Sequence, residues 1–313
     1  MLRSDSPSRP SGLDDLLDAK LVSRLSQLDL TSRKVFTGRL KGERRSKKRG
    51  ESVEFADHRP YVVGDDLRFI DWNIYGRLDR LFLKLFMEEE DLSLHLVVDC
   101  SASMGCGEPE KFGYCQRLAA ALGYIGMVNL NRVTLTAIGA PKPEGAPAPA
   151  VLSVIRNLRG RRRASEMGAW LCGLEPAGVS RFDEACKRIA LTRTGKGVMV
   201  VLSDFFFKEG YETGLRMLVG RGFDVFCIQT LSPQEVEPEI GGDLRLKDIE
   251  DADIAEVTIS APLLKRYKEN LAAYCDQWRQ FCARRDIATM TIRTDTPVET
   301  VILDYLRTRG LLR

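Results

Sequence analysis

The chain has 313 residues, more than twice the common domain size of roughly 100–150 residues, so we expect one large domain or a core domain with an attached segment. Hydrophobic residues make up 44% and charged residues 29% of the sequence, which excludes intrinsically disordered and collagen-like chains. The net charge of +3 hides an asymmetry, because residues 33–49 hold nine basic side chains against the single acid Glu43. That segment carries +8, which leaves −5 for the remainder.

The sequence predicts a cytoplasmic protein without a membrane segment. Its longest apolar runs, such as 94–98 and 197–202, are far shorter than the roughly 18 residues of a membrane-spanning helix. The N-terminal stretch MLRSDSPSRPSG lacks the apolar centre of a signal peptide.

Eight cysteines and two histidines are spread along the chain. No CxxC pair occurs, and neither His58 nor His95 lies near a pair of cysteines, so the sequence offers no zinc ligand set. We expect the cysteines to be reduced thiols that pack as small hydrophobic side chains.

The N-terminal region combines a helical pattern with a basic arm. Leucines recur at helical intervals in 13–30, which predicts a short amphipathic helix. The basic arm at 33–49 is typical of a solvated, mobile segment, and a footprint for nucleic acid or an acidic protein is the alternative. Phe36 is its only aromatic residue, whereas sites for single-stranded nucleic acid combine basic side chains with several aromatic ones on which the bases stack.

Residues 51–90 mix strand-like pieces with turn signals, and we expect them to pack against the main domain. Aspartates at 65, 66 and 71 alternate there with arginines and aromatic residues, a pattern that suits a structural network of ion pairs or an interface. The predicted organisation is an N-terminal extension with a basic arm at 1–91, packed on a main domain at 92–313.

From residue 92 onward, apolar runs alternate with helical stretches. Buried strands are predicted at 94–99, 133–138, 198–203, 224–229 and 287–292. Helices are predicted at 111–130, 166–174, 181–192, 211–220, 262–285 and 297–309. This alternation predicts an α/β fold with Rossmann-type layering, a mostly parallel sheet flanked by helices on both faces. Two interruptions remain, a Pro/Ala-rich loop at 141–149 and a predicted hairpin insertion near 244–259.

Polar side chains follow two of these strands. The first strand ends in the run DCSAS, which places Asp99, Ser101 and Ser103 on one tight loop before a helix. Asp204 directly follows the strand at 198–203. Because ligands of open parallel sheets bind outside the carboxyl ends of the strands, these residues are the expected site.

The chemistry of this loop is that of hard oxygen ligands. A carboxylate and two hydroxyls suit Mg²⁺ or Mn²⁺ that keeps several waters. Asp204 could then bind the ion directly or hold one of its waters. The alternative is that Asp99 and the serines only cap the following helix.

These residues resemble the metal-ion-dependent adhesion site of the von Willebrand factor type A domain. That site uses Asp-x-Ser-x-Ser, a threonine on a second loop and an aspartate after a later strand, and a partner protein binds by completing the metal shell with an acidic side chain. The resemblance implies that Asp99, Ser101, Ser103 and Asp204 hold the metal.

The resemblance also assigns a residue to the threonine position. The family's threonine, followed six residues later by a leucine, falls on Ser165 and Leu171, so a serine replaces it. Three arginines and an alanine precede Ser165, where the family has a glycine pair.

A second stretch resembles the bacterial family known as domain of unknown function 58. The matching motifs are GESVEF, RPY, GDDLR and IDW, at 50–55, 59–61, 64–68 and 70–72. The resemblance extends over about residues 13–310. Members carry a type A-like domain and are typically encoded beside MoxR-type AAA+ ATPases, which are thought to act as chaperones in assembling or activating other proteins. The resemblance therefore implies a protein partner, either such an ATPase or its client or both, and it places this chain in the short branch without membrane helices.

Enzyme classes find little support in the sequence. Gly195-Lys196-Gly197 lacks the other residues of a phosphate-binding P-loop, and no Ser/His/Asp arrangement is available. Asp99 and Asp204 with Mg²⁺ could serve phosphoryl chemistry, but no lysine or histidine is evidently placed to assist. The sequence predicts a non-enzymatic, metal-dependent protein-binding module. A metal-dependent phosphohydrolase and a nucleic-acid binder using residues 33–49 are the alternatives.

Overall fold

The structure is a computed structural model that describes residues 10–30, 55–86, 92–139, 153–192, 197–247 and 254–312. The predicted basic arm at 33–49 and the Pro/Ala-rich loop at 141–149 lie outside the described residues. The chain divides into two compact units, a main unit of Met1–Arg39 with Leu92–Arg313 and a hairpin unit of Leu40–Asp91. The N-terminal helical segment thus belongs to the main unit. That the rest of the extension packs on the main domain stays a prediction.

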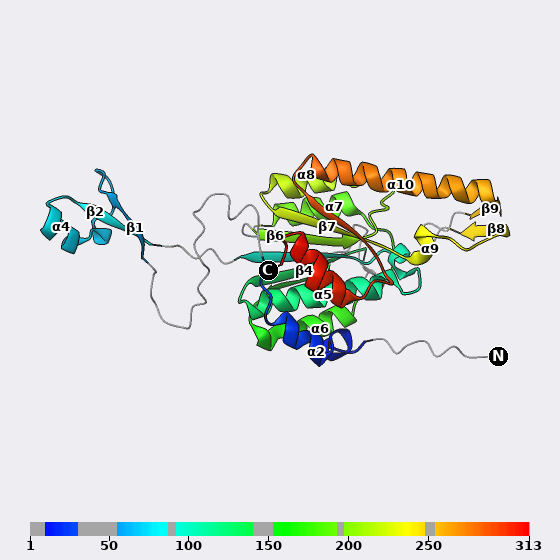
Figure 1. Cartoon of the computed structure of the whole chain (residues 1–313), viewed down its shortest axis with the longest axis horizontal. Helices are drawn as coiled ribbons and strands as arrows, with labels where there is room; N and C mark the ends of the chain where they lie inside the picture. The colour runs from blue at the N-terminus through cyan, green and yellow to red at the C-terminus, as the bar shows by residue number, and fades with distance from the viewer. Residues whose placement is uncertain are drawn as a thin grey trace, which may run out of the picture. The chain divides into compact units, whose positions relative to one another are not determined.

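A six-stranded sheet in the order β10-β7-β6-β3-β4-β5 forms the centre of the main unit (Figure 1). Its strands are β3 (Ser93–Asp99), β4 (Arg132–Ile138), β5 (Ser153–Leu158), β6 (Gly197–Ser203), β7 (Asp224–Leu231) and β10 (Ala288–Arg293). Every neighbouring pair is parallel except β4 and β5. The predicted α/β fold with a mostly parallel sheet is confirmed.

Alternate side chains of the central strands supply two separate cores, because successive residues of a strand point to opposite faces. Leu94, Leu96 and Val98 of β3 join the larger core with α5 (Lys111–Val128) and α6 (Ala164–Cys172). Val97 joins the second core, to which α7 (Phe182–Leu191), α8 (Glu212–Gly220) and α10 (Ala261–Ala283) contribute. Helices therefore cover both faces of the sheet (Figure 1).

The predicted N-terminal helix is in fact two short helices, α1 (Leu13–Leu16) and α2 (Ala19–Leu25). The backbone of Leu17 is extended, and the carboxylate of Asp18 caps α2 by accepting the N–H of Leu21 at 2.6 Å. A single helix was the wrong expectation because leucine spacing records only the buried face, whereas the aspartate cap starts a new helix. The leucines of both helices pack into the larger core.

Three further segments complete the main unit. β8 (Gly242–Lys247) and β9 (Ile254–Ile259) pair antiparallel and confirm the predicted hairpin, and the short helix α9 (Pro233–Val236) lies between β7 and β8 in the chain. The predicted C-terminal helix consists of α11 (Val298–Thr300), a π-helical segment (Val301–Tyr305) and α12 (Leu306–Thr308).

The hairpin unit pairs β1 (Phe55–Pro60) with β2 (Phe82–Phe86) around a 3₁₀ turn (Leu67–Phe69) and α4 (Trp72–Leu78). Asp71 caps α4 by accepting the N–H groups of Asn73 and Ile74 at 2.9 and 3.2 Å. Its other carboxylate oxygen lies 3.0 Å from Nε2 of His58. The predicted network of charged groups in this region is therefore present within the unit.

All eight cysteines are unpaired thiols, and Cys100, Cys115, Cys186, Cys227 and Cys282 are buried. Among the helices of the described residues, none combines the length and the apolar character that crossing a membrane requires.

Candidate functional site

Four of the five predicted site residues, Asp99, Ser101, Ser103 and Asp204, converge where the strand order of the sheet reverses. Numbered along the chain within the sheet, the strands lie in the order 3-2-1-4-5-6, so β3 and β6 are the first and fourth strands and adjoin. Val98 pairs with Leu202 across them, which puts Asp99 and Asp204 at the same carboxyl edge. Such a switch point is where open α/β sheets bind their ligands.

Asp99 is buried, with 1% of its surface exposed. One carboxylate oxygen accepts the N–H of Ser101 at 2.9 Å and the other accepts the hydroxyl of Ser203 at 2.7 Å. Burial, followed by the negative charge of Asp204, raises the pKa of Asp99 to about 7. A nearby positive charge would reverse this effect and stabilise the carboxylate.

The two serines of the loop face each other. The hydroxyl oxygens of Ser101 and Ser103 are 3.0 Å apart. Ser101 occupies the N-cap of the short 3₁₀ helix Ala102–Gly105, yet its side chain makes no capping hydrogen bond. α5 likewise begins after Glu110 without a side-chain cap. The alternative that these serines serve as helix caps is therefore not what the structure shows.

A buried lysine, which the sequence did not reveal as a site residue, binds Asp204. Nζ of Lys111 donates to Oδ2 of Asp204 at 2.7 Å and also contacts the carboxylate of Glu235. Lys111 is 1% exposed. Burial lowers its pKa, but the charges of Asp204 and Glu235 outweigh this effect and raise the pKa above its ordinary value. Lys111 therefore lies next to Asp204, although its position in the sequence gave no evident sign of this contact.

A cavity of about 150 Å³ opens beside these residues, lined by Ser101, Ser103, Val179, Ser180, Asp204, Phe206, Phe207, Lys208 and Glu209. Ser180 was not predicted. Its hydroxyl oxygen is buried and has no hydrogen-bond partner within the parts of the chain that the structure describes.

Backbone hydrogen bonds hold the loop of Ser180 against the Asp-x-Ser-x-Ser loop. The N–H of Ala177 donates to the carbonyl of Cys100 at 2.8 Å, and the N–H of Ala102 donates to the carbonyl of Gly178 at 3.0 Å. These two bonds join segments far apart in the sequence, and so Ser180 reaches the cavity.

Ser165 lies elsewhere. It is the second residue of α6, its side chain is exposed, and it is not among the residues that line the cavity. The structure thus brings Ser101, Ser103 and Asp204 together around the cavity, with Asp99 directly behind them, and it adds Ser180 rather than Ser165 as a third hydroxyl.

These oxygen atoms fit a hard divalent cation. Two carboxylates and three hydroxyls gather at one sheet edge, and one hydroxyl is buried without a partner. Carboxylate and hydroxyl oxygens are ligands that Mg²⁺ and Mn²⁺ accept. No trio of His, Cys, Asp and Glu side chains suited to a metal occurs within the described ranges, so a site here depends on the serine hydroxyls.

Among the proteins similar to this chain are two uncharacterized proteins of mycobacteria. The uncharacterized protein Rv1480 of Mycobacterium tuberculosis is 28% identical over 306 residues, which cover 95% of this chain and 93% of that protein. The uncharacterized protein MAV169 of Mycobacterium avium is 31% identical over 137 residues, which cover 43% of this chain and 79% of that protein.

The chain is also similar to two solved structures. The conserved hypothetical protein BatB from Bacteroides thetaiotaomicron has 11% identity and a TM-score of 0.42, covering 70% of this chain and 98% of that one. A von Willebrand factor type A structure from Catenulispora acidiphila has 10% identity and a TM-score of 0.37, and the match covers 73% of this chain and 43% of that one. A family model matches 219 of the 313 residues, from 57 to 275, and the chain therefore belongs to the family described as Protein of unknown function DUF58.

Proposed function

We propose that the main unit is a non-enzymatic protein-binding module whose carboxyl-edge cavity takes Mg²⁺ or Mn²⁺. Asp99, Ser101, Ser103 and Asp204 would hold the ion, as the sequence predicts, and Ser180 takes the role that the resemblance gave to Ser165. The observation that carries this proposal is the buried, unpartnered hydroxyl of Ser180 beside two serines and an aspartate in one cavity.

The surrounding residues hold these oxygens in place before any ligand arrives. Ser203 and the backbone of Ser101 fix both oxygens of Asp99. Lys111 and the backbone N–H of Phe206, which donates to Oδ1 at 3.1 Å, fix Asp204. A bound divalent ion would supply the positive charge that attracts an acidic side chain of a partner protein. The cavity beside these oxygens would admit that carboxylate.

For the partner we propose a MoxR-type AAA+ ATPase, its client, or both. Membership of the DUF58 family supports this choice, because members resembling this chain are typically encoded beside such ATPases. The protein would then act in the assembly or activation of other proteins, and we propose that it does so in the cytoplasm.

The phosphohydrolase alternative gains nothing from Lys111. Although this lysine lies next to Asp204, its ammonium group is buried and already bound by two carboxylates, so it is not presented to a substrate. Turnover of a generic phosphate ester that disappears in Asp99→Ala would overturn the non-enzymatic proposal.

A pull-down of the candidate ATPase tests the proposal. The wild type is compared in Mg²⁺ and in chelator, and the variants Ser101→Ala and Ser180→Ala are compared in Mg²⁺. The matched control is Ser165→Ala, because Ser165 is an exposed serine outside the cavity.

We expect the complex with wild type and Ser165→Ala in Mg²⁺, and its loss in chelator and in both cavity variants. Equal capture under all conditions would mean that recognition uses another surface. The region of Arg68, Asp71 and Trp72 in the hairpin unit would then be the better candidate, since Trp72 is 63% exposed.

A further inference from the structure

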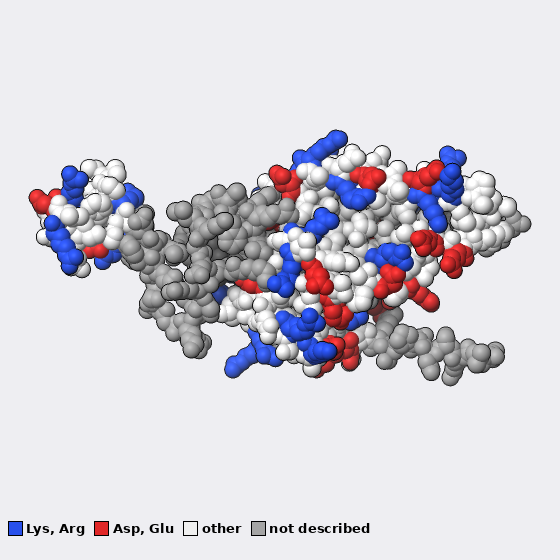
Figure 2. All heavy atoms as spheres, viewed as in Figure 1, with Lys and Arg blue, Asp and Glu red and all other residues white. Residues whose placement is uncertain are grey.

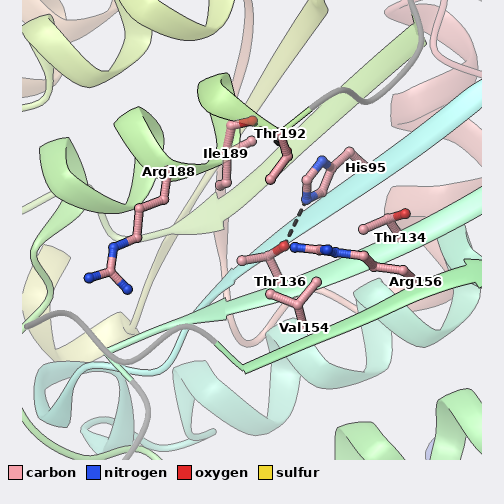
Figure 3. Close-up of a pocket in the computed structure, with 8 residues that line it drawn as sticks. All are labelled: His95, Thr134, Thr136, Val154, Arg156, Arg188, Ile189 and Thr192. Atoms are coloured by element: carbon pink, nitrogen blue, oxygen red, sulfur yellow. Dashed lines mark hydrogen bonds between the residues drawn. The ribbon is translucent and has the colours of Figure 1, made fainter.

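A second cavity lies between α7 and the edge of the sheet formed by β3, β4 and β5 (Figure 3). Its volume is about 230 Å³, and it is lined by His95, Thr134, Thr136, Val154, Arg156, Arg188, Ile189 and Thr192. None of these residues belongs to the carboxyl-edge site. The volume is several times the roughly 30 Å³ that one water molecule occupies in the liquid.

The pleat of the strands explains why this cavity is polar. His95 pairs with Thr134 across β3 and β4, and Thr136 pairs with Val154 across β4 and β5. These side chains share the face opposite Leu94, Leu96 and Leu135, which belong to the larger core. Near its end, α7 contributes Ile189 from the other side.

His95 is the unusual member of this group. It is 2% exposed, and its Nε2 lies 2.8 Å from the hydroxyl of Thr136. Nδ1 is buried and has no hydrogen-bond partner among the residues that the structure describes. Burial, followed by the positive charge of Arg156, lowers the pKa of His95 to about 4. The ring is therefore neutral at pH 7, and one of its nitrogens needs a partner.

The charge around the cavity is positive. Among the described residues that line it, none is an Asp or Glu, whereas two are the arginines Arg156 and Arg188. Arg188 is paired with Glu184 at 3.1 Å, and in Figure 3 its guanidinium turns away from His95. The guanidinium of Arg156 lies beside Thr136, below the His95 ring (Figure 3). No carboxylate partner of Arg156 occurs in the described parts of the chain.

We propose that this cavity binds a phosphate group, either free inorganic phosphate or the phosphate of a small monoester. A tetrahedral oxyanion offers oxygens on several sides at once, which matches the planar guanidinium fork of Arg156, the threonine hydroxyls and the imidazole around it. A carboxylate is planar and would leave part of this set without a partner.

Phosphate titration of the full-length chain, followed by the ¹⁵N resonances of the histidine rings, tests the proposal. The chain has only two histidines, so the spectrum of His95→Gln identifies the His95 ring. We expect saturable shifts of this ring with phosphate at pH 7 and none with chloride at equal ionic strength.

Variants separate the cavity from a general effect of basic surface. Arg156→Gln should weaken phosphate binding by about tenfold or more, because it removes charge-assisted hydrogen bonds. Arg156→Lys should retain part of the affinity because it keeps the charge without the fork. Arg161→Gln is the matched control, since Arg161 is exposed on η3 (Arg161–Arg163) and lies outside the cavity lining.

The source of the phosphate follows from a parallel titration with methyl phosphate. Tighter binding of methyl phosphate would identify a monoester ligand, and equal binding would identify the phosphate group as the whole of the recognised ligand. Either result supports the site. Absence of saturable His95 shifts with both probes, or equal weakening by Arg156→Gln and Arg161→Gln, would overturn it.

Discussion

Two buried titratable side chains of β3 respond to pH in opposite directions. Asp99 has a raised pKa, about 7, so the unfolded chain releases its proton first and the folded state loses stability as pH rises from about 4 to 7. His95 has a lowered pKa, about 4. Its contribution to the stability of the folded state is therefore fully present above its ordinary pKa of roughly 6.5 and is lost as pH falls toward about 4. The two effects partly cancel in the whole protein, and only a variant separates them.

Replacing His95 with glutamine measures the contribution of this histidine to the pH dependence of stability. The free energy of unfolding of wild type minus that of His95→Gln should fall as pH drops from about 7 toward about 4, by up to about 3 kcal/mol. Urea unfolding in a phosphate-free buffer at several pH values measures this difference. His58→Gln serves as the control for the other histidine. A wild-type-minus-His95→Gln difference that stays constant over this range would contradict the neutral, buried state of the ring.

The ammonium group of Lys111 pairs with the carboxylates of both Asp204 and Glu235 and offsets one of their two negative charges. Lys111→Met leaves a buried carboxylate unpaired, and we expect a loss of about 3–5 kcal/mol in the free energy of unfolding in chelator. Added Mg²⁺ should restore part of this loss, because the freed oxygen of Asp204 becomes available to the ion. Chemical unfolding with and without Mg²⁺ measures both effects.

The control for this charge removal is Lys187→Met, because Lys187 is an exposed lysine of α7. If Lys111→Met were no less stable than Lys187→Met, the buried ion pairs would have no structural role.

Among the helices and strands, features that depend on neighbouring residues in the sequence could be predicted. Features that depend on contacts between distant segments could not. The strands of the parallel sheet are predominantly apolar, and Asp99, Ser101 and Ser103 lie where one of them ends, so both the fold and this loop could be predicted from the sequence. β5 is an edge strand with Arg156 and Asn157 exposed, which leaves too little apolar pattern to predict it.

Ser180 and Lys111 escaped prediction for different reasons. Ser180 is placed by backbone bonds between loops far apart in the sequence, and a spacing rule tied to a leucine selected Ser165 instead. Lys111 was missed because lysines are rarely buried. Its position at the first turn of α5 was the available signal, since that helix begins at the carboxyl edge of β3.

The proposed role of Ser180 in place of Ser165 leads to a prediction for metal binding. Ser180→Ala removes a hydroxyl from the cavity and should reduce the stabilisation of the protein by Mg²⁺, whereas Ser165→Ala should leave it unchanged. The shift in melting temperature over a Mg²⁺ titration, compared among wild type and the two variants, measures this. Loss of the shift in Ser165→Ala alone would return the role to Ser165.

For the molecule as a whole, we expect the basic arm at 33–49 to be dispensable for the fold. The two hydrophobic clusters are built from residues of the main unit, and the arm at 33–49 contributes few apolar side chains. Deleting residues 41–49 should leave the melting temperature nearly unchanged. A destabilisation of several kcal/mol would show that the arm packs against other parts of the chain.

We propose that the cavity at the junction of β3 and β6 binds a divalent ion through serine hydroxyls and aspartates. Titration with Mn²⁺, followed by loss of the free-ion electron paramagnetic resonance signal, tests it most directly. We predict one saturable site with a dissociation constant roughly between micromolar and millimolar, because few of the ligands are anionic. The Ser101→Ala/Ser103→Ala double variant should lose this site while remaining folded. An isotherm that is unchanged in the double variant, or no saturable site in the wild type, would contradict the claim.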